Sequence, residues 1–207
     1  MKNKVLLLAL VAVLTSLSSF FRPLEGGLQV GDQAADFKLK NVDGKTVSLA
    51  DNKAAKGYIL VFTCNTCPYA QAYEQRIIDL HRKYAGQGYP VVAINPNDPQ
   101  VTPGDSFAEM QKRASSKKYP FAYLLDETQE VARTYGATRT PHVYVLQRAG
   151  ADLKVAYIGA IDNNTEDGKA ATARYVEQAL TELMAGRPVS TTATKAVGCG
   201  IKWKKKA

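Results

Sequence analysis

The feature that most constrains this chain is a pair of cysteines that directly follows an apolar run. Residues 58–63 read Tyr-Ile-Leu-Val-Phe-Thr and predict a buried strand, and residues 64–68 read Cys-Asn-Thr-Cys-Pro. Pro68 favours the first position of a helix, where its missing N–H is not needed. The peptide dipoles at a helix N-terminus favour a thiolate, the species that attacks disulfides and peroxides. The spacing therefore predicts redox chemistry, with a structural disulfide or a metal clip as the alternatives.

The first 20 residues have the pattern of a secretory signal peptide. Lys2 and Lys4 precede an apolar run over residues 5–14, and small residues follow it up to Ser19. The run is shorter than the ~20 residues that a helix needs to span a bilayer. We therefore expect export, with the bacterial periplasm as the location and an uncleaved membrane anchor as the alternative. Disulfides persist in such a compartment, and an odd count of three cysteines leaves one thiol unpaired or exchanging among partners.

The formal charge of +8 belongs to the two ends of the chain. Residues 1–22 hold three basic side chains and residues 195–207 hold five, with no acidic residue in either segment, so the body between them is neutral overall. A neutral body gives no support to nucleic-acid binding. We expect membrane contact only through the leader or the basic tail, whose lysine run is typical of a solvated end.

Strand and helix patterns alternate between a linker at residues 21–29 and residue 186. The alternation of residues 36–40 and 46–49 around a turn that contains Gly44 predicts an N-terminal β-hairpin. Further strands are expected at residues 58–63, 90–94, 121–125, 142–146 and 153–158, and helices at residues 68–84, 105–115 (with Asp105 as the cap), 127–135 and 169–184. The tail, residues 187–207, is expected to be irregular. This order predicts one α/β domain over residues 30–186, with a central mixed sheet flanked by helices.

Residues 30–184 resemble the thioredoxin-like superfamily, in the redoxin branch that contains the alkyl hydroperoxide reductase and thiol-specific antioxidant proteins. The resemblance rests on Val-Gly-Asp-Gln-Ala-Ala-Asp-Phe at residues 30–37, where the family usually has proline in place of Ala35, and on residues 131–137 ahead of Thr140 and Pro141. Within the branch, the chain is similar to a peroxiredoxin-like group with Cys-Asn-x-Cys-Pro. The resemblance implies a thioredoxin-like fold, no organic cofactor, and substrate binding at a cis Thr140–Pro141 pair.

Each cysteine has an expected role. Cys67 is the expected nucleophile because Pro68 places it at the helix cap, and Cys64, three residues earlier, is the expected resolving partner. The reverse assignment stays open. Cys199 could receive the disulfide as a further resolving cysteine or form an intermolecular bridge, and burial of the Trp203 ring could hold the tail in place.

Thiol–disulfide exchange is the predicted activity, with protein or small-molecule thiols and disulfides as substrates and a reducing partner protein or small thiol as the electron source. A thiol-dependent, antioxidant peroxidase with Cys67 as the peroxidatic cysteine is the second hypothesis. The resemblance places a threonine or serine three residues before that cysteine and a proline four residues earlier still, where this chain has Cys64 and Leu60. The arginine of such enzymes falls at Thr140, beside Arg139.

The third hypothesis is a non-enzymatic redoxin that binds copper or a protein. Cys64, Cys67 and His142 could form a soft metal site. We nevertheless expect no metal, and we expect His142 to be a structural histidine, because side chains alternate along its strand and point it away from its neighbours.

Overall fold

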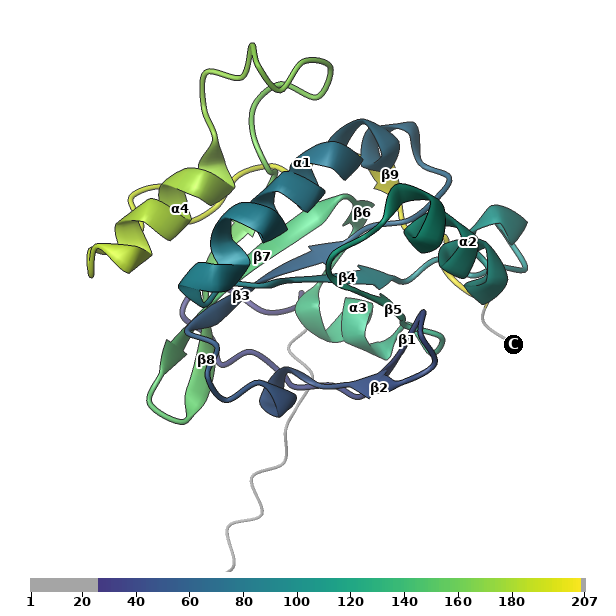
Figure 1. Cartoon of the computed structure of the whole chain (residues 1–207), viewed down its shortest axis with the longest axis horizontal. Helices are drawn as coiled ribbons and strands as arrows, with labels where there is room; N and C mark the ends of the chain where they lie inside the picture. Colours follow the sequence, from purple (N-terminus) through teal and green to yellow (C-terminus); the bar gives the residue numbers. More distant parts are fainter. Residues whose placement is uncertain (1–25, 206–207) are drawn as a thin grey trace, which may run out of the picture.

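The structure, a computed structural model, describes residues 26–205, so the predicted signal peptide and most of the predicted linker lie outside the described residues. Its centre is a seven-stranded mixed sheet in the order β2-β1-β5-β4-β3-β7-β8 (Figure 1). These strands are β1 (Leu39–Asn41), β2 (Thr46–Val47), β3 (Gly57–Phe62), β4 (Val91–Asn95), β5 (Ala122–Leu125), β7 (His142–Ala149) and β8 (Asp152–Gly159). The α-helices are α1 (Pro68–Tyr84), α2 (Phe107–Lys117), α3 (Glu130–Tyr135) and α4 (Tyr175–Met184). The predicted α/β fold with a mixed sheet is confirmed.

The interior strand β3 leads directly to the cysteine pair. β3 pairs in parallel with β4 and antiparallel with β7, and β4 pairs in parallel with β5. The predicted hairpin of β1 and β2 adds antiparallel to β5, and β7 pairs antiparallel with β8 as expected. Every residue of β3 is buried, which is why this strand reads as a continuous apolar run rather than an alternating one.

Successive side chains of β3 supply two separate cores. Ile59 and Val61 pack with residues from α1, α2 and α4 on one face of the sheet. Leu60 and Phe62 pack with residues from α3 and from the N-terminal segment on the other face. The period-two alternation of a strand divides its side chains in this way. Figure 1 shows α1 and α4 on one side of the sheet and α3 on the opposite side.

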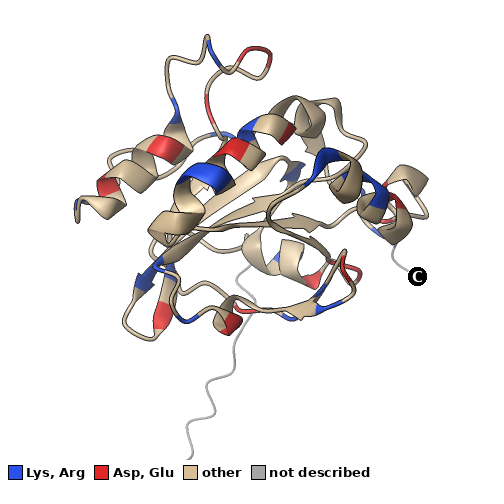
Figure 2. Cartoon of the chain, in the orientation of Figure 1, with Lys and Arg blue, Asp and Glu red and all other residues tan. Residues whose placement is uncertain are grey.

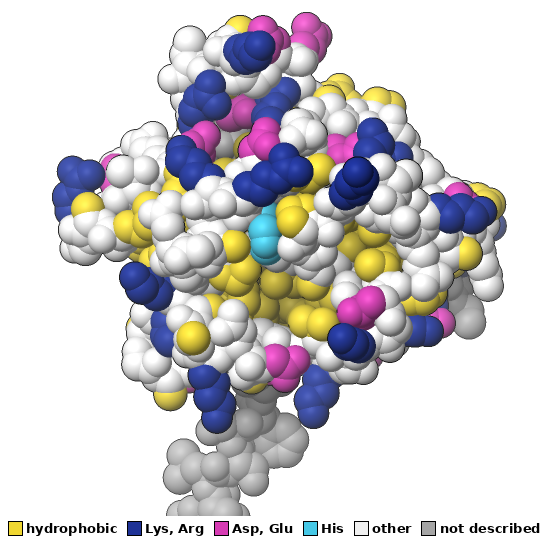
Figure 3. Space-filling model, in the orientation of Figure 1, with side chains coloured by type: hydrophobic (Ala, Val, Ile, Leu, Met, Phe, Trp, Pro, Cys, Tyr) yellow, Lys and Arg dark blue, Asp and Glu magenta, His cyan; other side chains and the backbone are white. Residues whose placement is uncertain are grey.

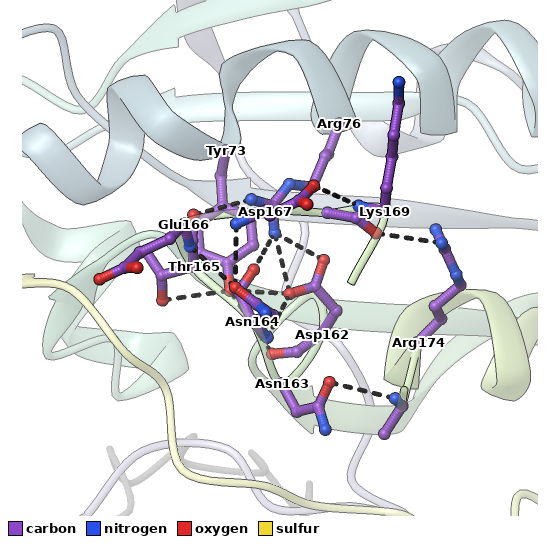
Figure 4. A network of polar contacts seen from close by, with 12 residues as sticks. Tyr73, Arg76, Asp162, Asn163, Asn164, Thr165, Glu166, Asp167, Lys169 and Arg174 are labelled. Atoms are coloured by element: carbon purple, nitrogen blue, oxygen red, sulfur yellow. Dashed lines mark hydrogen bonds and ion pairs between the residues drawn. The ribbon is translucent and has the colours of Figure 1, made fainter. Parts of the chain in front are cut away.

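Four segments differ from the expectations. α3 begins at Glu130 rather than at residue 127. α4 begins at Tyr175 rather than at residue 169, because the side chains of Asn163 and Asn164 accept hydrogen bonds from backbone N–H groups of residues 166–173 and so compete with a helix (Figure 4). α2 follows Ser106 rather than Asp105, which is fully buried. The tail is not irregular throughout, since β9 (Cys199–Gly200) pairs antiparallel with β6 (Arg139–Thr140) in a small second sheet.

Charged side chains are dispersed over the described surface. Figure 2 shows Lys and Arg interspersed with Asp and Glu along the chain, and Figure 3 shows hydrophobic side chains gathered in the middle of one face with charges around them. None of the helices within residues 26–205 is long and apolar enough to cross a membrane.

Candidate functional site

Cys67 lies between the end of β3 and the start of α1. β3 ends at Phe62, a short loop follows, and Cys67 is the N-cap of α1 with Pro68 in the first turn. Its backbone is extended (φ −72°, ψ 124°), as N-cap residues usually are. The cysteine thus stands at the positive end of a 17-residue helix. The loop residue Cys64 is buried beside it, and the two cysteines form a small buried cluster with Ala70 in the first turn of the helix.

A buried carboxylate fixes the loop between the two cysteines. Asp105 accepts hydrogen bonds from the Asn65 backbone N–H at 2.6 Å, the Thr66 hydroxyl at 2.8 Å and the Asn97 side-chain amide at 2.8 Å. The Tyr123 hydroxyl donates a hydrogen bond to Asn65 Oδ1 at 2.9 Å. Two of these donors, the Asn65 N–H and the Thr66 hydroxyl, belong to the loop, so their bonds to a buried carboxylate hold the loop in one geometry. The sequence suggested only a capping role for Asp105, so its position at the site is a finding of the structure.

The strand opposite the cysteines supplies the predicted proline pair. The Thr140–Pro141 peptide bond is cis. Thr140 contacts both cysteines: its Oγ1 lies 3.2 Å from Cys64 Sγ, and its carbonyl oxygen lies 3.2 Å from Cys67 Sγ. The structure therefore brings Cys64, Cys67, Thr140 and Pro141 to one place.

The tail brings the third cysteine to the same place. In the β6–β9 pair, Cys199 lies opposite Thr140 and Gly200 lies opposite Arg139. The Cys199 backbone N–H points at Cys67 Sγ at 3.4 Å, and the Cys199 side chain packs on the cluster of Cys64 and Cys67. All three cysteines are free thiols in this structure. The sequence placed Cys199 in a tail without a fixed position, and β9 gives it one.

The rest of the tail is anchored beyond β9. Ile201 is buried in the core under α3, and the Lys202 backbone N–H donates to Asn97 Oδ1 at 2.9 Å. Trp203 is half-buried rather than enclosed, and the Arg133 guanidinium lies 4.5 Å from its ring centroid. A cation over an aromatic face is attractive. Trp203, which is partly buried against the core, therefore helps to hold the tail on the body.

The environment of Cys67 favours its thiolate. A hydrogen bond from the Cys64 thiol is the largest cause, and together with the Cys199 side chain and the amides of Ala70 and Cys199 it outweighs burial and lowers the Cys67 pKa to about 4. The Thr140 carbonyl oxygen opposes ionisation of Cys67, because the Cys67 sulfur can donate to it only when it is protonated. At neutral pH the donors outnumber this single acceptor, so Cys67 is the thiolate of the cluster.

The other two sulfurs are held as thiols. The hydrogen bond to Cys67 raises the pKa of Cys64 far above its ordinary value, and burial and the nearby Asp105 carboxylate raise it further. Burial, followed by the hydrogen bond to Cys67 and its charge, raises the pKa of Cys199 to about 11. The cluster thus has one thiolate, Cys67, and two thiols, Cys64 and Cys199. Cys67 is therefore the candidate nucleophile, and the two thiols are the candidate resolving groups.

His142 is buried beside the site, in surroundings that suit the predicted structural role. It is buried, and burial together with the positive charge of Arg139 lowers its pKa to about 4, so its ring is neutral at pH 7. The Thr138 backbone N–H lies 3.5 Å from its Nδ1, and its ring packs on Tyr144. Within residues 26–205, no group of three or more His, Cys, Asp or Glu side chains is arranged to hold a metal ion.

A cysteine pair at a helix N-terminus, facing a cis-proline that precedes an interior strand of a mixed sheet, defines the class of thioredoxin-fold redox proteins. Residues 30–158 match the AhpC/TSA family, and the chain belongs to that family. The resemblance to the redoxin branch is thereby confirmed.

Individual relatives agree with this placement. The chain is similar to the thiol-disulfide oxidoreductase ResA of Halalkalibacterium halodurans, with 25% identity over 139 residues that make up 67% of this chain and 74% of ResA. The crystal structure of an uncharacterized conserved protein from Geobacillus kaustophilus matches with 40% identity and a TM-score of 0.80, over 86% of this chain and 94% of that one. Peroxidoxin BcpB from Mycobacterium tuberculosis shares the fold, with 20% identity and a TM-score of 0.59 over 77% and 99% of the two chains.

Proposed function

We propose that this protein is an exported thiol–disulfide oxidoreductase of the peroxiredoxin-like group with Cys-Asn-x-Cys-Pro, acting in the bacterial periplasm in redox homeostasis. The observation that carries the proposal is the Cys67 sulfur at the N-terminus of α1, in contact with the Cys64 thiol and held as a thiolate. Export is supported by the sequence of residues 1–20. The substrates are protein or small-molecule disulfides, and a reducing partner protein or small thiol regenerates the dithiol.

The reaction has two steps that conserve atoms and electrons. The Cys67 thiolate attacks a substrate disulfide, forms a mixed disulfide and releases one substrate thiolate, which takes up a proton. This step removes the charge on Cys67, and with it the largest cause of the raised Cys64 pKa. Cys64 then loses its proton, attacks Cys67 Sγ and releases the second substrate thiolate, leaving a Cys64–Cys67 disulfide. Two electrons pass from the protein to the substrate.

Exchange is preferred over peroxide reduction because of the neighbours of Cys67. Side chains that polarise a peroxide must point at its oxygens. Here the position three residues before Cys67 is Cys64, a second thiol, and the Thr140 hydroxyl lies against that thiol at 3.2 Å. The pair is therefore suited to closing a disulfide rather than to orienting a peroxide.

The proposal is tested by mixing the reduced protein with insulin or glutathione disulfide. We expect both substrates to be reduced, and we expect non-reducing peptide mapping to find Cys64 joined to Cys67. Thiol-dependent hydrogen peroxide consumption serves as the comparison. A protein that consumed peroxide rapidly and left both disulfides oxidised would contradict the proposal and favour the peroxidase alternative.

The Cys67 thiolate has a measurable pH signature. Iodoacetamide reacts with thiolates, so the alkylation rate of Cys67 follows its ionised fraction. With a pKa of about 4, the rate is expected to be constant above about pH 6 and to fall as the pH drops through 4, whereas an ordinary cysteine has its midpoint at about pH 8.5. Limited access of the reagent to the buried Cys67 sulfur lowers the rate by the same factor at every pH, so the midpoint still reports the pKa. Peptide mapping assigns the label to Cys67, and a midpoint above pH 8 would contradict the assignment.

A further inference from the structure

The tail forms a strand on the edge that faces the nucleophile. β9 pairs with β6 so that Cys199 lies opposite Thr140, the residue that contacts both Cys64 and Cys67. The Cys199 backbone N–H reaches Cys67 Sγ at 3.4 Å, and its side chain packs on the same cluster. In Figure 1 this strand (yellow) lies beside the N-terminal end of α1.

The close approach of the tail depends on a glycine. A Cβ added at Gly198 would lie 2.2 Å from the Thr140 carbonyl oxygen and 3.0 Å from the Pro141 nitrogen, which no side chain tolerates without a shift of the backbone. A Cβ added at Gly200, on the other side of Cys199, would meet nothing within 4 Å. The residue before Cys199 therefore has to be glycine for β9 to pair with β6, the arrangement that we call the seated strand. The residue after Cys199 is under no such constraint.

Contacts on both sides of Cys199 hold the seated strand. Arg139 Nη1 donates to the Gly198 carbonyl oxygen at 2.9 Å, and the Ile201 backbone N–H donates to the Thr138 carbonyl oxygen at 3.2 Å. The Ile201 side chain is buried. A thiol held in this way has a high effective concentration at Cys67 Sγ.

We propose that Cys199 is a third redox-active cysteine, which resolves the mixed disulfide on Cys67 when β9 is seated and forms a Cys67–Cys199 disulfide. The proposal rests on the proposed role of Cys67 as nucleophile. The Cys199 thiol gives its proton to solvent and its thiolate attacks Cys67 Sγ. The bond between Cys67 and the substrate sulfur breaks, and the substrate leaves as a thiolate that is then protonated. As with Cys64, two protein thiols supply the two electrons.

The chemistry of the cluster allows Cys199 to ionise in this step, as it allows Cys64. Two of the causes that raise its pKa, the hydrogen bond to Cys67 and the charge of Cys67, disappear once Cys67 is part of a mixed disulfide. Cys199 keeps only the effect of burial, the largest cause of its raised pKa, whereas Cys64 keeps the effects of burial and of the Asp105 carboxylate. Cys199 is also half-buried, whereas Cys64 is buried, so solvent can accept the Cys199 proton. Cys199 is therefore the more readily ionised resolving thiol.

The test uses the full chain with Cys64→Ser and 5,5′-dithiobis(2-nitrobenzoate), a small disulfide that releases a coloured thiolate. Attack by Cys67 releases one equivalent, and resolution by Cys199 releases a second. We expect two equivalents from Cys64→Ser, a final mass with no nitrobenzoate retained, and a peptide map that joins Cys67 to Cys199. The double variant Cys64→Ser/Cys199→Ser is expected to release one equivalent and to retain the adduct on Cys67.

The two glycines provide a matched pair of variants in the Cys64→Ser background. Gly198→Ala is expected to slow the second release by about tenfold or more, since a displaced nucleophile loses much of its proximity advantage, and to leave the first release no slower. Gly200→Ala, in the same strand, is expected to match its parent. Equal rates of the second thiolate release in Cys64→Ser and in its Gly198→Ala and Gly200→Ala derivatives would overturn the role of the seated strand.

The outcomes separate this proposal from the proposed function. If wild-type protein forms the Cys64–Cys67 disulfide while Cys64→Ser stops after one equivalent with the adduct on Cys67, the role of Cys199 is wrong and the exchange activity stands. A Cys199–Cys199 bridge between two chains, seen on a non-reducing gel, would also overturn it. If Cys67 in wild-type protein does not react at all, the proposed function itself fails.

Discussion

Replacing Cys67 by serine is expected to lower the rate of the first exchange step by at least about a thousandfold, as removal of an attacking nucleophile does in other enzymes. A serine hydroxyl is not ionised at neutral pH, so the sulfur that attacks is lost. The substitution is close to isosteric, and the serine hydroxyl can donate to the Thr140 carbonyl oxygen, which lies 3.2 Å from Cys67 Sγ. We therefore expect the fold to be retained.

The matched control for this prediction is Cys64→Ser. It removes the buried partner but leaves the Cys67 sulfur at the helix N-terminus, so the first release of thiolate from a small disulfide should persist. Its alkylation midpoint should rise, because the Cys64 thiol is the largest cause of the low Cys67 pKa. If Cys64→Ser abolished the first step and Cys67→Ser did not, the roles of the two cysteines would be reversed.

Replacing Arg76 by methionine is expected to destabilise the protein by about 2–4 kcal/mol, because it leaves a buried carboxylate without its cation. Arg76 lies on α1 and donates to both oxygens of Asp162 at 2.9 and 2.8 Å (Figure 4). It also donates to the Thr165 carbonyl oxygen at 2.7 Å and stacks over the Tyr73 ring at 4.3 Å. The Asp162 side chain is 3% exposed, so water cannot replace these bonds.

The matched control is Arg82→Met on the same helix. Arg82 pairs with Asp79 at 3.7 Å, but these side chains are 61% and 59% exposed. Exposed pairs contribute little, so we expect a change of less than about 0.5 kcal/mol. Urea unfolding of the reduced proteins at pH 7 measures both values. Equal effects at the two positions would show that the network in Figure 4 does not anchor α1 to the loop before α4.

Local patterns account for the parts of this protein that the sequence predicted well. The continuous apolar run before Cys64 indicated a strand buried on both faces, and β3 is buried throughout. Pro68 indicated a helix start, and Cys67 is the N-cap of α1. Both signals depend on residues within a few positions of each other, where sequence spacing and spatial distance agree.

The predicted helix starts are wrong where side chains replace the backbone as hydrogen-bonding partners. Residues 169–174 have helix-forming residues but are held in a loop by the Asn163 side chain, so α4 starts at Tyr175. Asp105 precedes α2, yet it turns inward to the cysteine loop and leaves the N-cap position to Ser106. Such choices depend on which partners the packed chain offers, and periodicity does not report them.

By itself, the sequence determined that one sulfur stands at the start of a helix behind a buried strand, because both features are local. Only the tertiary structure decided which groups surround that sulfur. The Asp105 carboxylate and the Asn65 amide that it holds are 40 residues apart, and the Cys199 amide lies 132 residues from the Cys67 sulfur that it contacts. A two-residue strand such as β9 has no periodicity to detect, and it forms because the folded body presents the edge of β6 to the tail.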